Sequence, residues 1–444
     1  MTNLQAYFLP HPPLAVPSVG GGQEIKIEET LRAFDEVARE IAKLAPEVIV
    51  FITPHTTIYT DYFHISPNER ASGSLSRFGA PKTRFEAEYD VELAKEIARK
   101  AEENGIAAGF EGERDASLDH GVTVPMWYIN QHFSSYKIVR IGQSGFLPEE
   151  HYLLGRLIAE AAEKTGKKAV LIASGDLSHK LSDDGPYGIA PEGVEFDALV
   201  CNAFSNGDLH ALFNISNELR AAAGECGYGS AMVMAGFLSG HEVKARLLSY
   251  ECPFGVGYAV ASFESVALKQ AAPVEQNPYV ALARSSLEHY VQTGQMLPIP
   301  SELPKEMLEN QAGAFVSLHK HGHLRGCIGT IAKATPSIAH EVVKNAVSAG
   351  AHDPRFEPTA LAELPFLTYK VDILAEPEII ESIDQLDVKR YGVIVSSGNK
   401  RGLLLPNLDG IDTVEEQVAI AKNKAGIKAG APCTLERFEV IRHE

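Results

Sequence analysis

Short runs of apolar, β-branched residues alternate with amphipathic segments along the first part of the chain, and this alternation constrains the fold most strongly. The run EVIVFIT (Glu47–Thr53) has the length and composition of a buried strand. In the preceding segment, Glu28–Leu44, apolar residues recur at spacings of three and four, which predicts an amphipathic helix. Two further apolar runs, 136–141 and 168–173, flank a predicted helix over 149–164. Such alternation predicts an α/β domain with a mainly parallel central sheet.

The composition changes at the polar segment QAAPVEQNP, which has two prolines and no periodicity. A chain of 444 residues is also longer than one hydrophobic core usually serves. We therefore predict a first domain over 1–268, a linker over 269–277 and a second domain over 278–444. In the second domain, predicted helices over 279–292 and 414–425 enclose strand-like segments, so we expect a smaller α+β fold.

The net charge and the cysteines of the chain indicate which classes of partner it can bind and in which cellular compartment we expect it. The formal net charge of −18 disfavours binding to nucleic acid. The five cysteines are widely spaced without a CxxC motif, which favours a reducing, cytoplasmic compartment. No run of about 18 apolar residues is present, so we expect no membrane span. Exposed sheet edges in α/β domains often pair, so a homo-oligomer is compatible with the sequence.

Four histidines lie in loops next to predicted strands: His11 in FLPHPPL, His55 in FITPHTT, His120 in SLDHGVTVP and His179 in ASGDLSH. Enzymes of the α/β class place their chemistry at strand ends, and neutral imidazole is a common ligand of iron, zinc and copper. A single histidine there could equally cap or hydrogen-bond the backbone. Four in similar settings predict a metal pocket, whereas His151, in a polar helical context, is predicted to lie on the surface.

The segments FLPHPPL, TPHTT, LDHGVTVPMWYI and ASGDLSH, in this order, resemble the class III extradiol ring-cleavage dioxygenases of the LigB type and the related Memo-like proteins. The resemblance covers most of residues 1–265. It implies that His11 and His55 bind the metal, a non-haem Fe(II), with zinc or copper as alternatives. It also implies that His179 is the acid/base near a substrate hydroxyl and that His120 contacts the substrate or supports the site.

The third metal ligand is open between two neighbouring residues. Ring-cleaving members use a glutamate late in the domain, whereas Memo-like members have a Cys-Gly pair there. This chain reads GECGYGSAMVMAGF, with Glu225 and Cys226 adjacent. We favour Glu225 as the ligand; the alternatives are Cys226, or a turn that binds nothing. A thiolate would make the site softer and would disfavour simple oxygen activation.

In the second domain, the strings HLRGCIGT, HDPRFEP and RGLLLPN resemble the AMMECR1 family over about residues 278–442. This family implies no defined activity. Cys327 lies beside Arg325 and could be a nucleophile or a structural thiol in a glycine-rich turn. Asp353 and Arg355 are expected to form a structural pair or to bind an anion.

Three functions remain in competition. The first is an Fe(II)-dependent dioxygenase that cleaves a catechol-like small molecule in aromatic compound metabolism. The second is another kind of metalloenzyme that works with a radical-SAM partner, because Memo-like and AMMECR1 proteins are associated with such a protein in a three-part system, AmmeMemoRadiSam. The third is a metal-binding protein without catalysis. Glu225 on the metal would favour the first function, and Cys226 would favour the other two.

Overall fold

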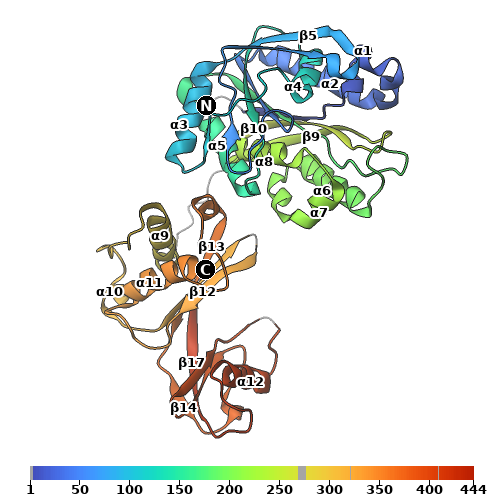
Figure 1. Ribbon diagram of the computed structural model, residues 1–444. Coiled ribbons are helices and arrows are strands. Elements are labelled where there is room, and N and C mark those ends of the chain that lie inside the picture. Colours follow the sequence, from blue (N-terminus) through green and yellow to red (C-terminus); the bar gives the residue numbers. More distant parts are fainter. Residues whose placement is uncertain (1–3, 269–276, 321, 409) are drawn as a thin grey trace. The chain divides into compact units, whose positions relative to one another are not determined.

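The computed structural model describes residues 4–268, 277–320, 322–408 and 410–444. The chain forms two compact units, Met1–Gln270 and Ala271–Glu444 (Figure 1). Apart from Asn277, the predicted linker lies outside the described residues. Within the described ranges, no helix is both long enough and apolar enough to cross a membrane.

The first unit is built on a six-stranded sheet in the order β7-β2-β8-β1-β10-β9. The first four strands in this order are parallel, and the last two are antiparallel to their neighbours. This arrangement confirms the predicted α/β fold with a mainly parallel sheet. The strands are β7 (Lys137–Gly142), β2 (Val48–Thr53), β8 (Ala169–Ser174), β1 (Gln5–Leu9), β10 (Tyr258–Leu268) and β9 (His241–Glu251).

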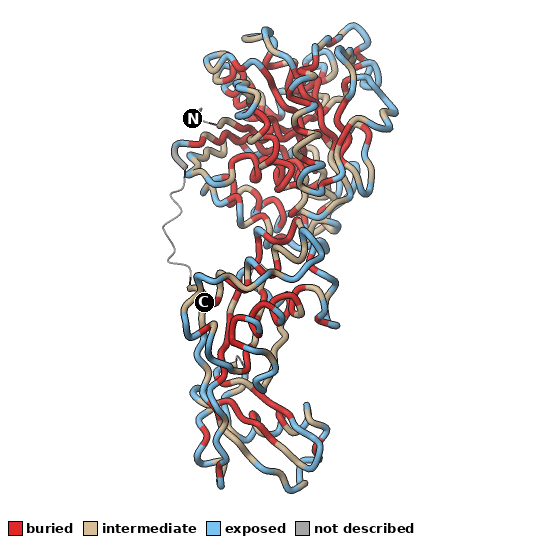
Figure 2. Tube along the Cα trace, turned by 90° about the vertical axis from the view of Figure 1, so that its left-hand side faces the viewer, coloured by how far each residue is buried: buried red, intermediate tan, exposed pale blue. Residues whose placement is uncertain are grey.

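Helices pack against this sheet, and buried residues concentrate along its strands (Figure 2). The helix predicted over Glu28–Leu44 is α2, with the predicted bounds. Helix α5 (Pro148–Thr165) contacts α8 (Tyr228–Phe237) very closely because Gly155 has no side chain: a Cβ there would lie 1.9 Å from the carbonyl oxygen of Val233. The other long helices are α3 (Val91–Glu103), α4 (His120–Ile129) and α6 (Pro191–Asn206).

The topology brings several loops to one edge of the sheet. Strands β1, β2 and β8 are parallel neighbours, so their carboxyl ends meet at the same edge. Beside this edge, the hairpin of β4 (Arg70–Leu75) and β5 (Ala80–Glu88) extends from the sheet. The loops at this edge carry most of the candidate site residues.

The second unit contains an antiparallel seven-stranded sheet, which confirms the smaller α+β domain. Helices α9 (Pro278–Thr293) and α11 (Ile338–Ala351) form a core with β11 and β13. A second core lies around α12 (Val414–Lys424). The strands are β11 (Ala314–Lys320), β12 (His323–Gly329), β13 (Leu367–Leu374), β14 (Glu378–Ile380), β15 (Tyr391–Ser397), β16 (Lys400–Leu404) and β17 (Thr434–His443).

Candidate metal centre

His11 follows β1, is almost fully buried and is held in one tautomer. Its Nδ1 lies 2.9 Å from Ser174 Oγ, and that hydroxyl donates to the carbonyl oxygen of Gly121 at 2.6 Å. A hydroxyl has a single proton, so Ser174 must accept its other bond from the Nδ1–H of His11. The Nε2 of His11 therefore carries a lone pair, as a metal ligand requires.

Two further ligand atoms lie next to this lone pair. The Nε2 of His55, in the loop after β2, is 2.9 Å from His11 Nε2, and the Sγ of Cys226 is 3.6 Å from it. These three atoms all lie within 4.8 Å of one another. The Cys226 sulfur also belongs to a second group of possible ligand atoms, together with Asp176 and His179. Imidazole nitrogen and thiolate sulfur together suit a transition metal such as iron, zinc or copper.

Cys226 reaches the histidines because two loop backbones touch. A Cβ on Gly175 would lie 2.1 Å from the Cα of Gly227, so only glycine fits there. The backbone N–H of Asp176 donates to Cys226 Sγ at 3.3 Å, and Gln143 Nε2 donates to the Cys226 carbonyl at 2.8 Å. The sulfur and the backbone of Cys226 are thus each held by a hydrogen bond.

Substituting Gly175 by alanine should push these loops apart. We expect a destabilisation of about 1–3 kcal/mol, because the new methyl group overpacks a tight contact, together with weaker binding of Co(II) as a probe ion. Thermal unfolding and a Co(II) titration measure the two effects. Gly430→Ala is the control, since open space surrounds that position. Unchanged Co(II) affinity in Gly175→Ala would contradict the role given to this contact.

Glu225 points elsewhere, which corrects the preference for it as the third ligand. Its Oε2 accepts from the backbone N–H of Tyr228 at 2.7 Å, in the first turn of α8. Free N–H groups at a helix start attract a carboxylate. The side chain that the structure brings to His11 and His55 is that of Cys226.

The other two histidines complete the cluster. His120 is the first residue of α4, so the expectation that it follows a strand is wrong. Its ring stacks on His55 with centroids 3.9 Å apart. His179 lies in the loop after β8, and its buried Nε2 has no hydrogen-bond partner among the described residues. Burial, and then His55, lower the pKa of both rings, that of His120 to about 3. Both imidazoles are therefore neutral.

Sequence reasoning missed Asp176 and misplaced His151. Asp176 Oδ1 accepts from the backbone N–H of His11 at 2.9 Å, and burial raises the pKa of this carboxyl to about 7. The signal was present, since Asp176 lies three residues before His179 in the motif ASGDLSH. His151, in the first turn of α5, is buried rather than on the surface. Its ring packs edge-on against the ring of Phe63.

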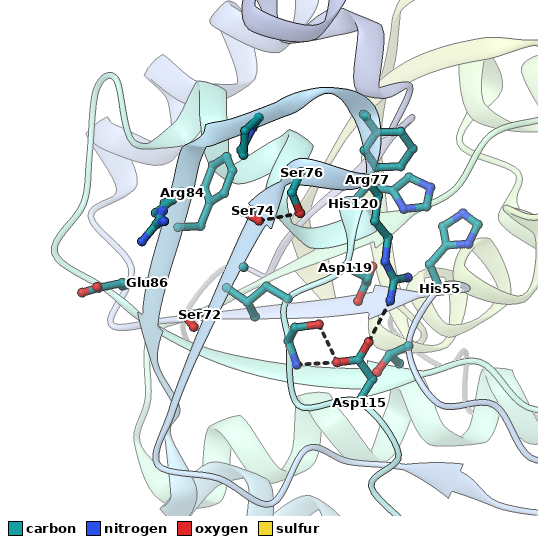
Figure 3. Close-up of a pocket in the computed structure, with 17 residues that line it drawn as sticks. His55, Ser72, Ser74, Ser76, Arg77, Arg84, Glu86, Asp115, Asp119 and His120 are labelled. Atoms are coloured by element: carbon teal, nitrogen blue, oxygen red, sulfur yellow. Dashed lines mark hydrogen bonds and ion pairs between the residues drawn. The ribbon is translucent and has the colours of Figure 1, made fainter.

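A cavity of about 730 Å³ adjoins His55 and His120, and the β4–β5 hairpin forms its wall (Figure 3). Arg77 also lines this cavity, and its guanidinium pairs with Asp115 at 3.4 Å (Figure 3). One part of the wall is apolar, formed by Phe78, Pro81, Phe85 and Leu118. The wall of the cavity therefore carries polar groups, among them His55, His120 and Arg77, next to this apolar part.

In the second unit, the motif LRGCIGT forms the edge strand β12, and the motif HDPRFEP follows its outer side. Asp353 Oδ2 accepts from the backbone N–H of Cys327 at 2.9 Å, and Arg355 Nη2 donates to the Cys327 carbonyl at 3.0 Å. The two side chains also pair with each other at 2.6 Å, which confirms the predicted structural pair. Together they occupy the backbone N–H and C=O of Cys327 on this edge strand.

The Cys327 side chain has a different neighbour from the one expected. Arg325 pairs with the buried carboxylate of Glu363 at 2.9 Å rather than with the sulfur. Ser317 Oγ donates to Cys327 Sγ at 3.1 Å from the adjacent strand. These contacts do not support the activation of Cys327 by Arg325, and its role as a nucleophile stays a prediction.

Asp353→Ala should destabilise the second unit by about 1–3 kcal/mol, because the Cys327 N–H loses its acceptor. Arg355 lowers the pKa of Asp353, so this contribution is present at neutral pH and is lost as the pH falls below the ordinary range of aspartate. Urea unfolding at pH 7 and at acidic pH measures the difference. Asp353→Asn keeps an acceptor oxygen and should retain part of the stability. Equal stability of Asp353→Ala and the unmodified protein would contradict the prediction.

Comparison with known proteins agrees with this architecture. Residues 5–261 match the family model described as the catalytic LigB subunit of aromatic ring-opening dioxygenase, and residues 280–443 match AMMECR1. A protein of Clostridium acetobutylicum is 42% identical over 99% of this chain and 98% of its own length. A Thermotoga maritima protein is 48% identical over 38% of this chain and 99% of its own length.

Among solved structures, an uncharacterized protein of Pyrococcus horikoshii matches 37% of this chain and 88% of its own, with 32% identity and a TM-score of 0.35. The family model of the first unit spans more than half of the chain, and the clostridial relative matches both units end to end. The chain belongs to the LigB family of aromatic ring-opening dioxygenase catalytic subunits, and its LigB domain is followed by an AMMECR1 domain.

Proposed function

We propose that the first unit is a metal-dependent oxidoreductase that holds Fe(II) on His11, His55 and Cys226 and acts on a catechol-like small molecule. The observation that carries this proposal is the fixed tautomer of His11, whose Nε2 lone pair faces the other two ligand atoms. Zinc and copper are alternatives, because the same donors suit them. A metal held there would act as a template and Lewis acid for the oxygens of the substrate.

The surrounding side chains can supply the rest of the chemistry. The free Nε2 of His179 can accept the proton of a substrate hydroxyl and return it later, because its imidazole is neutral. His120 can hydrogen-bond a substrate oxygen from its position over His55. Arg77 and the apolar wall of the cavity would orient the ring.

A second candidate function follows from the sulfur ligand. A thiolate in place of a carboxylate favours softer metal chemistry and disfavours simple activation of O2. We therefore also propose a metalloenzyme, or a metal-binding component, that works with a radical-SAM partner. The AMMECR1 domain on the same chain is the observation that favours this arrangement.

One experiment separates these functions. The protein is reconstituted anaerobically with Fe(II), its bound metals are quantified, and a panel of catechols is added with O2. We expect bound iron and the yellow product of ring cleavage with at least one catechol. Bound iron without any product would reject the dioxygenase and favour the second candidate. If no iron, zinc or copper is retained, both candidates fail.

A further inference from the structure

Arg140, on β7, is an unusual residue for its position. It has the largest fully buried side chain in the described structure, with only 1% of it exposed, and it stands between the apolar residues Val139 and Ile141. Burying a guanidinium costs several kcal/mol, and apolar residues often replace buried ion pairs without loss of stability. The cost of this burial points to a role for Arg140 beyond stability.

The guanidinium binds the loop that forms one wall of the cavity. Its Nη1 donates to the carbonyl of Ser117 at 2.5 Å, and its Nη2 donates to the carbonyl of Asp115 at 3.2 Å. Nε donates to Ser66 Oγ at 2.7 Å, which fixes the plane of the group. Ser117 and Asp115 both line the cavity (Figure 3).

The same guanidinium also holds Asp119, at 3.6 Å from its Oδ2. The other oxygen of Asp119, Oδ1, accepts from Thr53 Oγ1–H at 2.7 Å. Thr53 Oγ1 in turn accepts from the backbone N–H of His55 at 3.2 Å. A continuous series of contacts thus links Arg140 to the loop that carries one metal-ligand candidate.

Asp119 acts on a second histidine as well. It is the residue directly before α4, and His120 is the first residue of that helix. The Asp119 carboxylate therefore ties the residue that precedes His120 to the loop that carries His55 through Thr53. The rings of the two histidines stack with centroids 3.9 Å apart. A displacement of Asp119 would move the two rings relative to each other.

We infer that Arg140 and Asp119 are a positioning pair that sets His55 and His120 in the geometry required by the metal centre. The inference rests on the proposed function, because it assigns a purpose to the placement of a proposed ligand. Groups that orient metal ligands from outside typically change metal affinity by about 10- to 100-fold when they are removed.

Three variants test the pair. Asp119→Ala removes both contacts, and Asp119→Asn keeps an oxygen that can accept from Thr53. Glu113→Gln is the matched control: Glu113 is the other carboxylate beside Arg140, at 3.5 Å, but its second contact is His64, at 3.3 Å. All three variants alter the same buried cluster, whereas only those of Asp119 touch the contacts that lead to His55 and His120.

Two measurements are made on each variant, alongside thermal unfolding. The first is the affinity and visible spectrum of bound Co(II). We expect Asp119→Ala to lose about 10- to 100-fold in affinity with shifted bands, Asp119→Asn to recover part of this loss, and Glu113→Gln to match the unmodified protein. The second is the imidazole NMR spectrum without metal, with signals assigned from His55→Gln and His120→Gln. We expect both signals to move in Asp119→Ala, to move less in Asp119→Asn, and to stay unchanged in Glu113→Gln.

The two proposals fail in different ways. If the unmodified protein binds no Co(II), the proposed metal centre fails, and the NMR spectra alone decide whether Asp119 positions the histidines. If Co(II) binds, equal losses in Asp119→Ala and Glu113→Gln would show that the cluster only stabilises the fold and would overturn the inference. Unchanged affinity and unchanged imidazole signals in Asp119→Ala would overturn it as well.

Discussion

Replacing Cys226 by serine should strongly weaken metal binding at the proposed site while leaving the fold intact. The sulfur belongs to both groups of candidate ligand atoms, so its loss impairs each of them. Removing a group that only orients a metal ligand typically lowers metal affinity by about 10- to 100-fold. We expect the loss of Co(II) affinity in Cys226→Ser to be larger than this. The sulfur-to-cobalt charge-transfer band in the near ultraviolet should disappear, and this band reports the ligand directly.

The pH dependence of metal binding provides a second check on Cys226. Burial, and then Asp176, raise the pKa of the thiol well above its ordinary value, so the metal-free protein holds it protonated. A metal must displace that proton. Affinity should therefore increase as the pH rises, and the slope should be smaller in Cys226→Ser.

Glu225→Gln is the control for this result. It removes a negative charge at the start of α8 but keeps an oxygen for the Tyr228 N–H, so we expect a loss of stability of about 0.3–1 kcal/mol. Its Co(II) affinity should be unchanged. The opposite outcome, with metal lost in Glu225→Gln and retained in Cys226→Ser, would reverse the assignment of the ligand.

His179→Gln should reduce turnover of any catechol that the protein cleaves by about 10²- to 10⁴-fold, with its metal retained. This range is typical when a general acid/base is removed, and glutamine keeps a polar amide that cannot exchange a proton. Because burial lowers the pKa of His179, the active neutral form should persist below the usual titration range of histidine. Initial rates between pH 5 and 8, with metal content measured in parallel, test both points.

An exposed histidine provides the control. His132 lies on the surface and bonds to Asp35, so His132→Gln should turn over substrate at the unmodified rate. A variant His179→Gln that loses metal together with activity would instead assign His179 to the metal, as its grouping with Asp176 and Cys226 allows.

The elements of the first unit were predictable because their signals are local. The run EVIVFIT corresponds to β2, and the three- and four-residue spacing in Glu28–Leu44 corresponds to α2 with its exact bounds. Periodicity records which face of an element is buried, and it needs no knowledge of the partner. The same local patterns placed His11 and His55 after β1 and β2, so these two could be singled out.

His120 and Asp176 show where local patterns fail. His120 opens a helix rather than following a strand, and its neighbour Asp119 bonds to Thr53, which is far away in the sequence. Asp176 meets His11 only because β8 pairs with β1 in the sheet. Contacts of this kind depend on strand order, which periodicity does not encode.

By itself, the sequence determined the class of fold, the two-part organisation and the histidines around which the site forms. Only the tertiary structure shows which of the neighbours Glu225 and Cys226 lies beside His11 and His55, because both are possible metal ligands and adjacent in the sequence. The decision rests on direction: the free N–H groups of α8 attract the carboxylate, and the contact between Gly175 and Gly227 brings the sulfur to His11. The direction in which each of these side chains points depends on the packing of segments that are distant in the sequence. For this reason only the folded structure shows it.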